Sequence, residues 1–337
     1  MESNGLPDAQ PTQADGWADT LAWAGARLRP GERIVAAEPL RGGWTSRMRR
    51  LRLTGPDGPR ALVLRSFVKP FYAVHAPAML GREMAVLDLL HRTPAGIPAA
   101  RPVALDAHAA HCDHPSLLMT ELPGSVRLDA ADAERRAGLL ARQLVRVHAL
   151  AVAPSDRPRA YEAWTAPDRV RIPAGTARPG TWRRAVDVIR REPPAHRPRF
   201  LHRDFHPGNV LFTGAGADLA VSGVVDWVET SWGPPDLDVA HCATTLALLH
   251  GVPAGLAFAD TYRAAGGQLS ATARDHLHWR LLDALAFAPD AEKVAVPWRE
   301  LGRADLTPAV LTARLEDYLA ALLDRYDHDG ATTGGVR

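Results

Sequence analysis

The sequence predicts an α+β chain in two parts, a small antiparallel sheet with one main helix followed by a larger, mostly helical part. Three short strand-like runs, separated by turn-rich connections, come early in the chain, at 33–40, 47–54 and 60–67. Beyond residue 122, apolar side chains recur three and four positions apart, which is typical of helices. A length of 337 residues with 46% hydrophobic residues is sufficient for two such parts.

The other elements of the first part follow from local patterns. Apolar residues at helical spacing predict a leading helix over 16–28. The main helix is predicted to begin at Pro77 and to run to about residue 92, because proline is favoured in the first turn of a helix. Two further strands, at 101–107 and 116–121, complete the sheet.

The second part follows a turn at Leu122-Pro123-Gly124. Six segments in it have helical spacing: 131–150, 181–191, 236–250, 254–265, 271–287 and 307–326. The expected division is therefore a first lobe at 16–121 and a second at 122–328, between loose tails at 1–15 and 329–337.

Composition excludes several classes of protein. The net charge of +2 is too small to favour a nucleic-acid partner. Two cysteines, Cys112 and Cys242, make neither a disulfide framework nor a zinc site. No apolar stretch approaches the length of a membrane span, and the N-terminus does not resemble a signal peptide. We expect a cytoplasmic protein without a membrane partner, either a monomer or a weak dimer.

The most informative segment reads His202-Arg-Asp-Phe-His-Pro-Gly-Asn209, and an apolar run after it ends at Asp226. Phosphoryl transfer requires a carboxylate to orient the attacking hydroxyl, and an Asn and an Asp to hold Mg²⁺ on the phosphates. Asp204, Asn209 and Asp226 fit these three roles.

This segment resembles the aminoglycoside phosphotransferase family, which has a protein-kinase-like fold. The matching segments, in the family's order, are 201–211, 223–227 and 233–241. Weaker landmarks lie upstream. They are Gly42-Gly43, Val63-Leu64-Arg65, Arg82-Glu83, 119–124 and 144–148. The resemblance covers residues 33 to 325 and implies a bilobal fold with a nucleotide between the lobes.

The resemblance also implies roles for individual residues. Asp204 is expected to be the catalytic base, and Asn209 and Asp226 the Mg²⁺ ligands. His202 is expected to brace the catalytic loop, His206 is characteristic of the small-molecule branch, and Asp238 is expected to be structural.

Nucleotide binding is expected to fall mainly to the first lobe. Arg65 occupies the strand position where protein kinases have a lysine, and Glu83 on the main helix is its expected partner. Lys69 is the alternative cation, although it lies beside Pro70, where the strand should end. The remaining expected contacts form two groups. They are Gly43, Thr45 and Ser46 in a phosphate-covering turn, and Thr120, Glu121 and Leu122 at the adenine edge.

The predicted activity is therefore an ATP- and Mg²⁺-dependent transfer to a hydroxyl of a small molecule, with GTP as the alternative nucleotide. An aminoglycoside or related antibiotic is one acceptor class, and a choline-, homoserine- or sugar-like metabolite is another. Carboxylates suited to a polycationic acceptor are available in the C-terminal part. They are Asp275, Asp283, Asp290 and Glu292.

Three other functions stay open from the residues. A non-catalytic nucleotide-binding regulator would not need Asp204, Asn209 and Asp226, all of which are present. A protein kinase would need a peptide-docking segment after Asp226, and none is recognisable. A zinc hydrolase could use His202 and His206, but only the scattered His241 and His250 are available to complete such a site.

Overall fold

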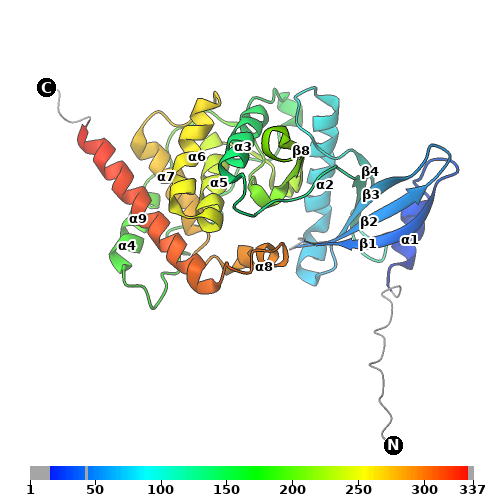
Figure 1. The fold of residues 1–337 in the computed structure, drawn as a ribbon, viewed down its shortest axis with the longest axis horizontal. Helices are drawn as coiled ribbons and strands as arrows, with labels where there is room; N and C mark the ends of the chain where they lie inside the picture. The colour runs from blue at the N-terminus through cyan, green and yellow to red at the C-terminus, as the bar shows by residue number, and fades with distance from the viewer. Residues whose placement is uncertain (1–15, 42–44, 333–337) are drawn as a thin grey trace, which may run out of the picture. The chain divides into compact units, whose positions relative to one another are not determined.

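The computed structural model describes residues 16–41 and 45–332, which form two compact units. Of the described residues, the first unit contains 16–40, 45–81 and 102–120, and the second contains 41, 82–101 and 121–332. The first is built on a sheet and the second mainly on helices, which confirms the predicted α+β class (Figure 1). The predicted tail at 1–15 and residues 333–337 lie outside the described residues.

The first unit contains one antiparallel sheet with the strand order β1-β2-β3-β5-β4. Its strands are β1 (Arg33–Leu40), β2 (Arg47–Thr54), β3 (Arg60–Ser66), β4 (Pro102–Asp106) and β5 (Ser116–Thr120). All five were predicted, and each observed boundary lies within one residue of the predicted one.

Helix α1 (Ala18–Gly25) shares a core with this sheet. Alternate residues of β2, including Leu51 and Leu53, face it because successive side chains on a strand point to opposite sides. The core also contains Trp17 and Trp23, both almost fully buried. Burying one leucine or aromatic side chain contributes about 2 kcal/mol. Each residue of this small core therefore makes a large contribution to the stability of the first unit.

The main helix begins earlier than predicted. Helix α2 spans Pro70–Arg92, with Pro77 inside it rather than at its start. Pro70 occupies the first position, where its missing N–H costs nothing. The segment between the prolines lacks a clear apolar stripe, because Phe71 and Val74 are exposed. Residues 70–81 belong to the first unit, and the rest of the helix belongs to the second.

The second unit is mainly helical. Its helices are α3 (Ala133–His148), α4 (Pro179–Ile189), α5 (Pro235–His250), α6 (Val252–Ala264), α7 (Ala273–Leu285), α8 (Glu292–Glu300) and α9 (Pro308–Thr332). The six predicted helices are confirmed. Helix α8 was not predicted, because it is short and contains Pro297. Helix α9 continues past the predicted end at residue 326.

Helix α5 is the central helix of the second unit, and almost all of its side chains are buried. It contacts α6, α7 and α9. Gly255 lets α6 approach it closely, since a β-carbon there would lie 2.5 Å from the carbonyl oxygen of Ala243. The residues of α5 are thus fixed by packing on every side.

Two short antiparallel pairs carry the loops of the site. The first is an antiparallel hairpin of β7 (Val210–Thr213) and β8 (Ala220–Val224). A pair between β6 (Arg199–Leu201) and β9 (Ser231–Gly233) was not predicted, because each strand has only three residues.

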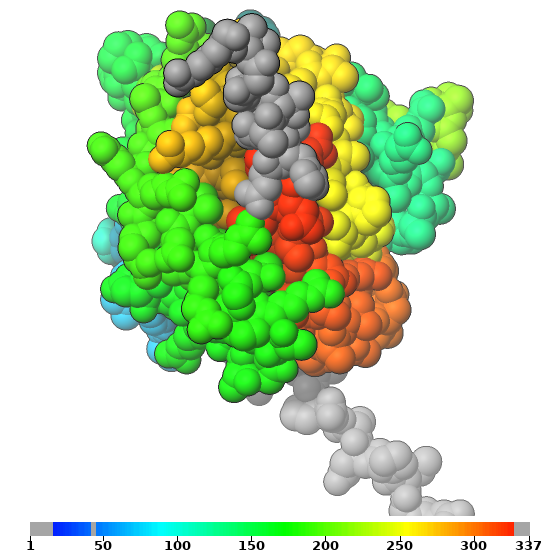
Figure 2. Space-filling view, turned by 90° about the vertical axis from the view of Figure 1, so that its left-hand side faces the viewer, coloured from blue at the N-terminus to red at the C-terminus, as the bar shows by residue number. Residues whose placement is uncertain are grey.

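Helix α9 lies on the surface of the second unit, beside the irregular segment that precedes α4 (Figure 2). Arg178 forms an ion pair with Asp317 at 2.7 Å, and the Trp182 Nε1 donates to Glu316 at 2.8 Å. Among the described residues, no helix is long and apolar enough to cross a membrane.

Candidate active site

The segment 202–209 leaves β6 and enters β7 through a short 3-10 turn at Pro207–Asn209. Arg203 within it has a φ of 75°. A residue other than glycine in this left-handed region costs about 1–3 kcal/mol. Other contacts must therefore hold the loop in place.

Asp238, in the first turn of α5, supplies those contacts. Its Oδ1 accepts from the backbone N–H of Arg203 at 2.7 Å, and its Oδ2 accepts from the backbone N–H of His202 at 2.9 Å. His148 donates through Nε2 to the same Oδ2 at 3.1 Å. Burial would raise the pKa of Asp238, but the hydrogen bond from His148 outweighs it and lowers the pKa. Asp238 is thus a buried carboxylate that fixes the loop.

His202 braces the loop from the other side. Its Nε2 donates to the carbonyl oxygen of Val225 at 3.0 Å, and its Nδ1 accepts from the N–H of Asp204 at 3.3 Å. These partners fix a neutral tautomer, and burial lowers the pKa of His202 in agreement. The ring also contacts Trp227, with centroids 4.4 Å apart.

The side chains of Asp204 and Asn209 are joined by a hydrogen bond. The Asn209 Nδ2 donates to the Asp204 Oδ2 and to the Asp204 carbonyl oxygen, both at 2.9 Å. Since a carboxylate only accepts, the amide must present its nitrogen here, which turns its oxygen away toward other ligands. The side chain of Asp204 is 30% exposed and can meet a substrate.

The hairpin brings Asn209 and Asp226 to one end. Val210 pairs with Val224, and the N–H of Val225 donates to the Asn209 carbonyl oxygen at 3.0 Å. Asp226 has a φ of 64°, again in the left-handed region. An amide oxygen and a carboxylate are hard ligands, so this pair fits Mg²⁺.

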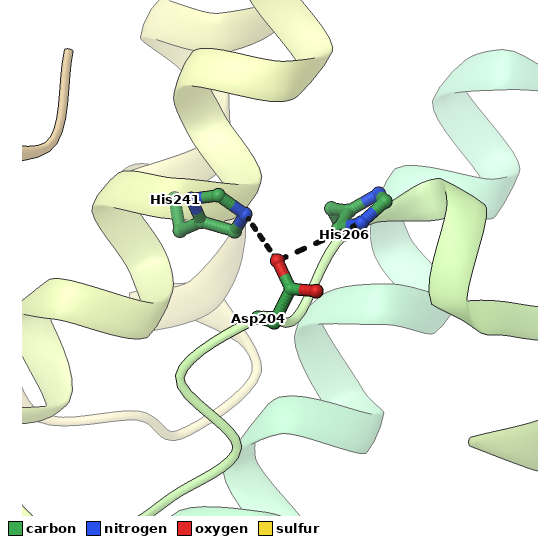
Figure 3. Close-up of side chains that lie close together, drawn as sticks. All are labelled: Asp204, His206 and His241. Carbon is green, nitrogen blue, oxygen red and sulfur yellow. Dashed lines mark ion pairs between the residues drawn. The ribbon is translucent and has the colours of Figure 1, made fainter. Parts of the chain in front are cut away.

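His241 is a site residue that the sequence reasoning missed. It lies one turn after Asp238 on α5, and its Nε2 is 3.0 Å from the Asp204 Oδ1 (Figure 3). Its Nδ1 is 3.1 Å from the Oδ1 of Asp283 on α7. Asp238 and His241 are three residues apart, which places both on one face of a helix. This spacing was the sequence signal that could have placed His241 near the same loop as Asp238.

The electrostatics follow from these contacts. Burial would lower the pKa of His241, but Asp283 and Asp204 outweigh it and raise the pKa to about 9. Burial would raise the pKa of Asp204, but His206 and His241 lower it. Burial lowers the pKa of His206 to about 4, so His206 is neutral near pH 7. Asp204 is therefore an ionised carboxylate beside one imidazolium.

Asp204, His206 and His241 also form a group that could hold a metal ion, with ligand atoms within 4.8 Å of one another. His241 is thus not scattered, as the sequence suggested. The Nδ1 of His206, however, accepts from the N–H of Gly208 at 3.0 Å. Its Nε2 then carries the ring hydrogen, although a neutral histidine needs that nitrogen free to bind metal. The geometry disfavours the zinc alternative.

Arg203 was left without a role by the sequence. Its guanidinium carbon lies 4.0 Å from the ring centre of Trp164, and its Nη2 donates to the carbonyl oxygen of Glu162 at 3.3 Å. Arg203 therefore connects the segment before α4 to the 202–209 loop.

In the first unit, Arg65 is buried on β3. Its Nε donates to the Ser46 Oγ at 3.1 Å, and its Nη2 contacts the Thr45 Oγ1 at 3.5 Å. Arg65 thus reaches two residues of the predicted phosphate-covering turn, whereas Lys69 is exposed at the start of α2. Gly43 lies outside the described residues.

The other predicted nucleotide contacts are placed as follows. Glu83 is buried on α2, and its pairing with Arg65 stays a prediction. Thr120 ends β5, and Glu121 and Leu122 follow it. Leu122 packs against Gly223 of the hairpin, where a β-carbon would meet its Cδ1 at 2.9 Å.

The four carboxylates proposed to attract a polycation are not equivalent. Asp283 is buried and bonded to His241, so it does not lie on a solvated face. Glu292 pairs with Arg299. Asp290 accepts from the N–H of Glu292 at 3.1 Å, and Asp275 lies in the first turn of α7.

A catalytic loop with a fixed carboxylate, followed by a hairpin that presents an Asn and an Asp, is typical of a kinase-type phosphotransferase. A family model described as the phosphotransferase enzyme family matches residues 36–279, so the chain belongs to that family. No curated protein matches the chain.

Solved structures agree on the fold. A putative aminoglycoside phosphotransferase from Ralstonia eutropha JMP134 is 17% identical with a TM-score of 0.62, covering 92% of this chain and 98% of that one. The GDP complex of aminoglycoside 2'-phosphotransferase-IIIa is 15% identical with a TM-score of 0.56, covering 86% and 93%. A thermostable mutant of aminoglycoside phosphotransferase APH(4)-Ia with ADP and hygromycin B is 15% identical with a TM-score of 0.53, covering 87% and 94%. The predicted protein-kinase-like fold is confirmed.

Proposed function

We propose that this protein is an O-phosphotransferase that moves the γ-phosphoryl group of ATP to a hydroxyl of a small molecule, with Mg²⁺. The observation that carries the proposal is the ionised, partly exposed carboxylate of Asp204, bonded through its Oδ2 to Asn209 at 2.9 Å. A carboxylate so placed can accept the proton of an acceptor hydroxyl and orient its oxygen for attack.

The metal ligands in this proposal are the amide oxygen of Asn209 and the carboxylate of Asp226, which the hairpin brings to one end. A bound Mg²⁺ would neutralise charge on the phosphates during transfer. The Nδ2 of Asn209 keeps its hydrogen bond to Asp204 in this arrangement, so one side chain serves both the metal and the base.

Arg65 is proposed to contact phosphate oxygens of the nucleotide. It is always charged, and its planar group can donate two hydrogen bonds at once. Its bonds to Ser46 and Thr45 support this, since they place a cation beside the turn expected to cover phosphates. ATP is the proposed donor, and GTP is the alternative because the structural relatives include complexes with ADP and with GDP.

The proposed acceptor is an aminoglycoside or related antibiotic, which would make the role antibiotic resistance. Support comes from the APH(4)-Ia relative, whose complex contains hygromycin B. A small-metabolite kinase with a choline-, homoserine- or sugar-like acceptor is the second candidate, because the buried position of Asp283 leaves one fewer carboxylate to attract a polycation. A non-catalytic regulator is the remaining alternative, and acceptor-dependent turnover would exclude it.

An acceptor screen tests this function. Release of ADP or GDP would be coupled to a panel of aminoglycosides, macrolides, amino alcohols and sugars, with the Asp204→Ala variant in parallel. We expect one class to stimulate turnover in the native protein and none to do so in the variant. Equal turnover in both proteins would overturn the mechanism, and nucleotide binding without any turnover would favour the regulator.

A further inference from the structure

His241 connects the proposed base to a second carboxylate in the helical core. Its side chain is only 4% exposed, and each ring nitrogen faces a carboxylate oxygen: Nε2 that of Asp204 at 3.0 Å, and Nδ1 that of Asp283 at 3.1 Å. Carboxylates that are ionised only accept hydrogen bonds, so both ring nitrogens carry hydrogens. The contact is therefore a charge-assisted pair on each side of the ring.

The far carboxylate is itself fixed. Asp283 is fully buried on α7, and its Oδ2 accepts from the Thr244 Oγ1 of α5 at 2.8 Å. Because one oxygen is held by Thr244 and the other faces His241, Asp283 presents a fixed acceptor to the ring. The two helices are thus joined at this point by a buried polar connection.

Packing fixes the plane of the His241 ring. Phe287 stacks on it with centroids 5.6 Å apart and an interplanar angle of 22°, and Trp164 meets it edge-on at 5.0 Å. Nε2 therefore has one direction available, which is toward Asp204.

The result is that both oxygens of Asp204 are held. His241 donates to Oδ1 at 3.0 Å, and Asn209 donates to Oδ2 at 2.9 Å. The terminal torsion of an aspartate is broad, so a carboxylate without such partners samples many orientations. A base must meet its proton within hydrogen-bond distance and in line, so this orientation matters for transfer.

We infer that His241 and Asp283 are positioning residues for the reaction: Asp283 orients His241, and His241 orients the carboxylate of Asp204 toward the acceptor hydroxyl. The inference rests on the proposed function. Neither residue needs to touch nucleotide or acceptor, so their loss should slow transfer without weakening binding.

The chain provides a matched control. Asp236 on α5 and His276 on α7 form a second buried Asp–His pair at 2.8 Å between the same two helices, and neither residue contacts Asp204. The replacement Asp236→Asn therefore perturbs the α5–α7 interface as Asp283→Asn does, but not the base.

The experiment measures kcat and KM for native protein, Asp283→Asn, His241→Gln, Asp236→Asn and Asp204→Ala, using the best acceptor found, or ATP hydrolysis by water when no acceptor responds. We expect kcat to fall about 10- to 100-fold in Asp283→Asn and His241→Gln, part of what a general base contributes. KM for ATP should change less than about twofold, and Asp236→Asn should keep the native kcat.

The outcomes distinguish failure of the positioning role from failure of the proposed function. A native kcat in Asp283→Asn and His241→Gln, with Asp204→Ala inactive, would overturn the positioning role alone. A native kcat in Asp204→Ala would overturn the proposed function itself. An equal fall in Asp236→Asn would show a general effect of interface damage and would also reject the inference.

A spectroscopic measurement does not depend on turnover. The imidazole ¹⁵N signals of His241, identified by their absence in His241→Gln, should show hydrogens on both ring nitrogens at about pH 7.5. Asp283→Asn should leave a hydrogen on one nitrogen only. A neutral His241 in the native protein would refute the proposed arrangement.

Discussion

The side-chain amide of Asn209 donates to the carboxylate of Asp204 at 2.9 Å, which ties the proposed metal ligand to the proposed base. The same nitrogen also donates to the Asp204 carbonyl oxygen at 2.9 Å, so the amide cannot rotate without losing both bonds. Its oxygen is therefore directed by the loop itself, before any cation binds.

Replacing Asn209 separates these two tasks. Asn209→Asp keeps an oxygen for Mg²⁺ but puts a second carboxylate against Asp204, so we expect kcat to fall about 100-fold with little change in the Mg²⁺ concentration for half-maximal rate. Asn209→Ala removes the oxygen as well and should raise that concentration about tenfold or more. Initial rates over a Mg²⁺ titration provide the test, and equal Mg²⁺ dependence in native protein and Asn209→Ala would contradict it.

The raised pKa of His241 predicts a pH-dependent stability. The pKa is about 9 in the folded chain and about 6.5 when unfolded, so the contribution is complete below pH 6.5 and is lost as pH rises through 9. Its size is about 3 kcal/mol, since each pKa unit corresponds to about 1.4 kcal/mol. Urea denaturation of native protein and His241→Gln should converge in free energy of unfolding between pH 6 and pH 10. A constant difference across this range would count against the charged imidazole.

Gly255 predicts a packing effect on α5 and α6. A β-carbon there would lie 2.5 Å from the Ala243 carbonyl oxygen and 2.6 Å from the Ala247 Cβ. Gly255→Ala should therefore lower the free energy of unfolding by about 1–3 kcal/mol, despite the better helix propensity of alanine. Gly138→Ala on α3, where the nearest atom is the flexible end of Arg142 at 3.6 Å, should be stabilising. Thermal denaturation compares the two variants, and a stable Gly255→Ala would mean that α6 can move away.

Arg65 and Lys69 can be distinguished by nucleotide affinity. Arg65→Ala should raise the Kd for ATP about 10- to 100-fold, because a charge-assisted hydrogen bond contributes about 1.5–3 kcal/mol. Lys69→Ala should leave Kd within about twofold, since Lys69 is exposed at the start of α2. Calorimetric titration measures both values. Weakened binding in Lys69→Ala alone would assign the phosphate contact to the lysine.

The zinc alternative also has a direct test. The hydrogen bond from Gly208 to His206 leaves no free ring nitrogen for a metal, so purified protein should contain well under one zinc per chain. Elemental analysis before and after a zinc-selective chelator, with activity measured in Mg²⁺, decides the question. One zinc per chain whose removal abolishes activity would restore the hydrolase hypothesis.

Much of the architecture could be predicted from the sequence, because the sheet strands and amphipathic helices alternate polar and apolar residues with clear periods. The start of α2 could not, since Phe71 and Val74 are exposed and give no stripe before Pro77. Helix α8 could not be predicted for a similar reason, because it is short and Pro297 interrupts its helical pattern.

The candidate residues Asp204, Asn209 and Asp226 could be proposed from the sequence because they follow one another in a recognisable order. Asp283 could not, because α7 is buried on nearly every side and its sequence does not reveal which residue faces the loop. His241 could have been found only through its three-residue spacing from Asp238 on α5. Two polar residues from separate helices meet there only through tertiary packing.

Asp238 holds the backbone of His202 and Arg203 while His148 of α3 holds Asp238, and His148 in turn contacts the Tyr262 hydroxyl of α6 at 2.7 Å. The conformation of the 202–209 loop therefore depends on the packing of α3, α5 and α6, and not on contacts within the loop alone. On heating, activity should therefore be lost over the same temperature range in which that helical core unfolds. The rate of the reaction would then report whether the second unit is folded.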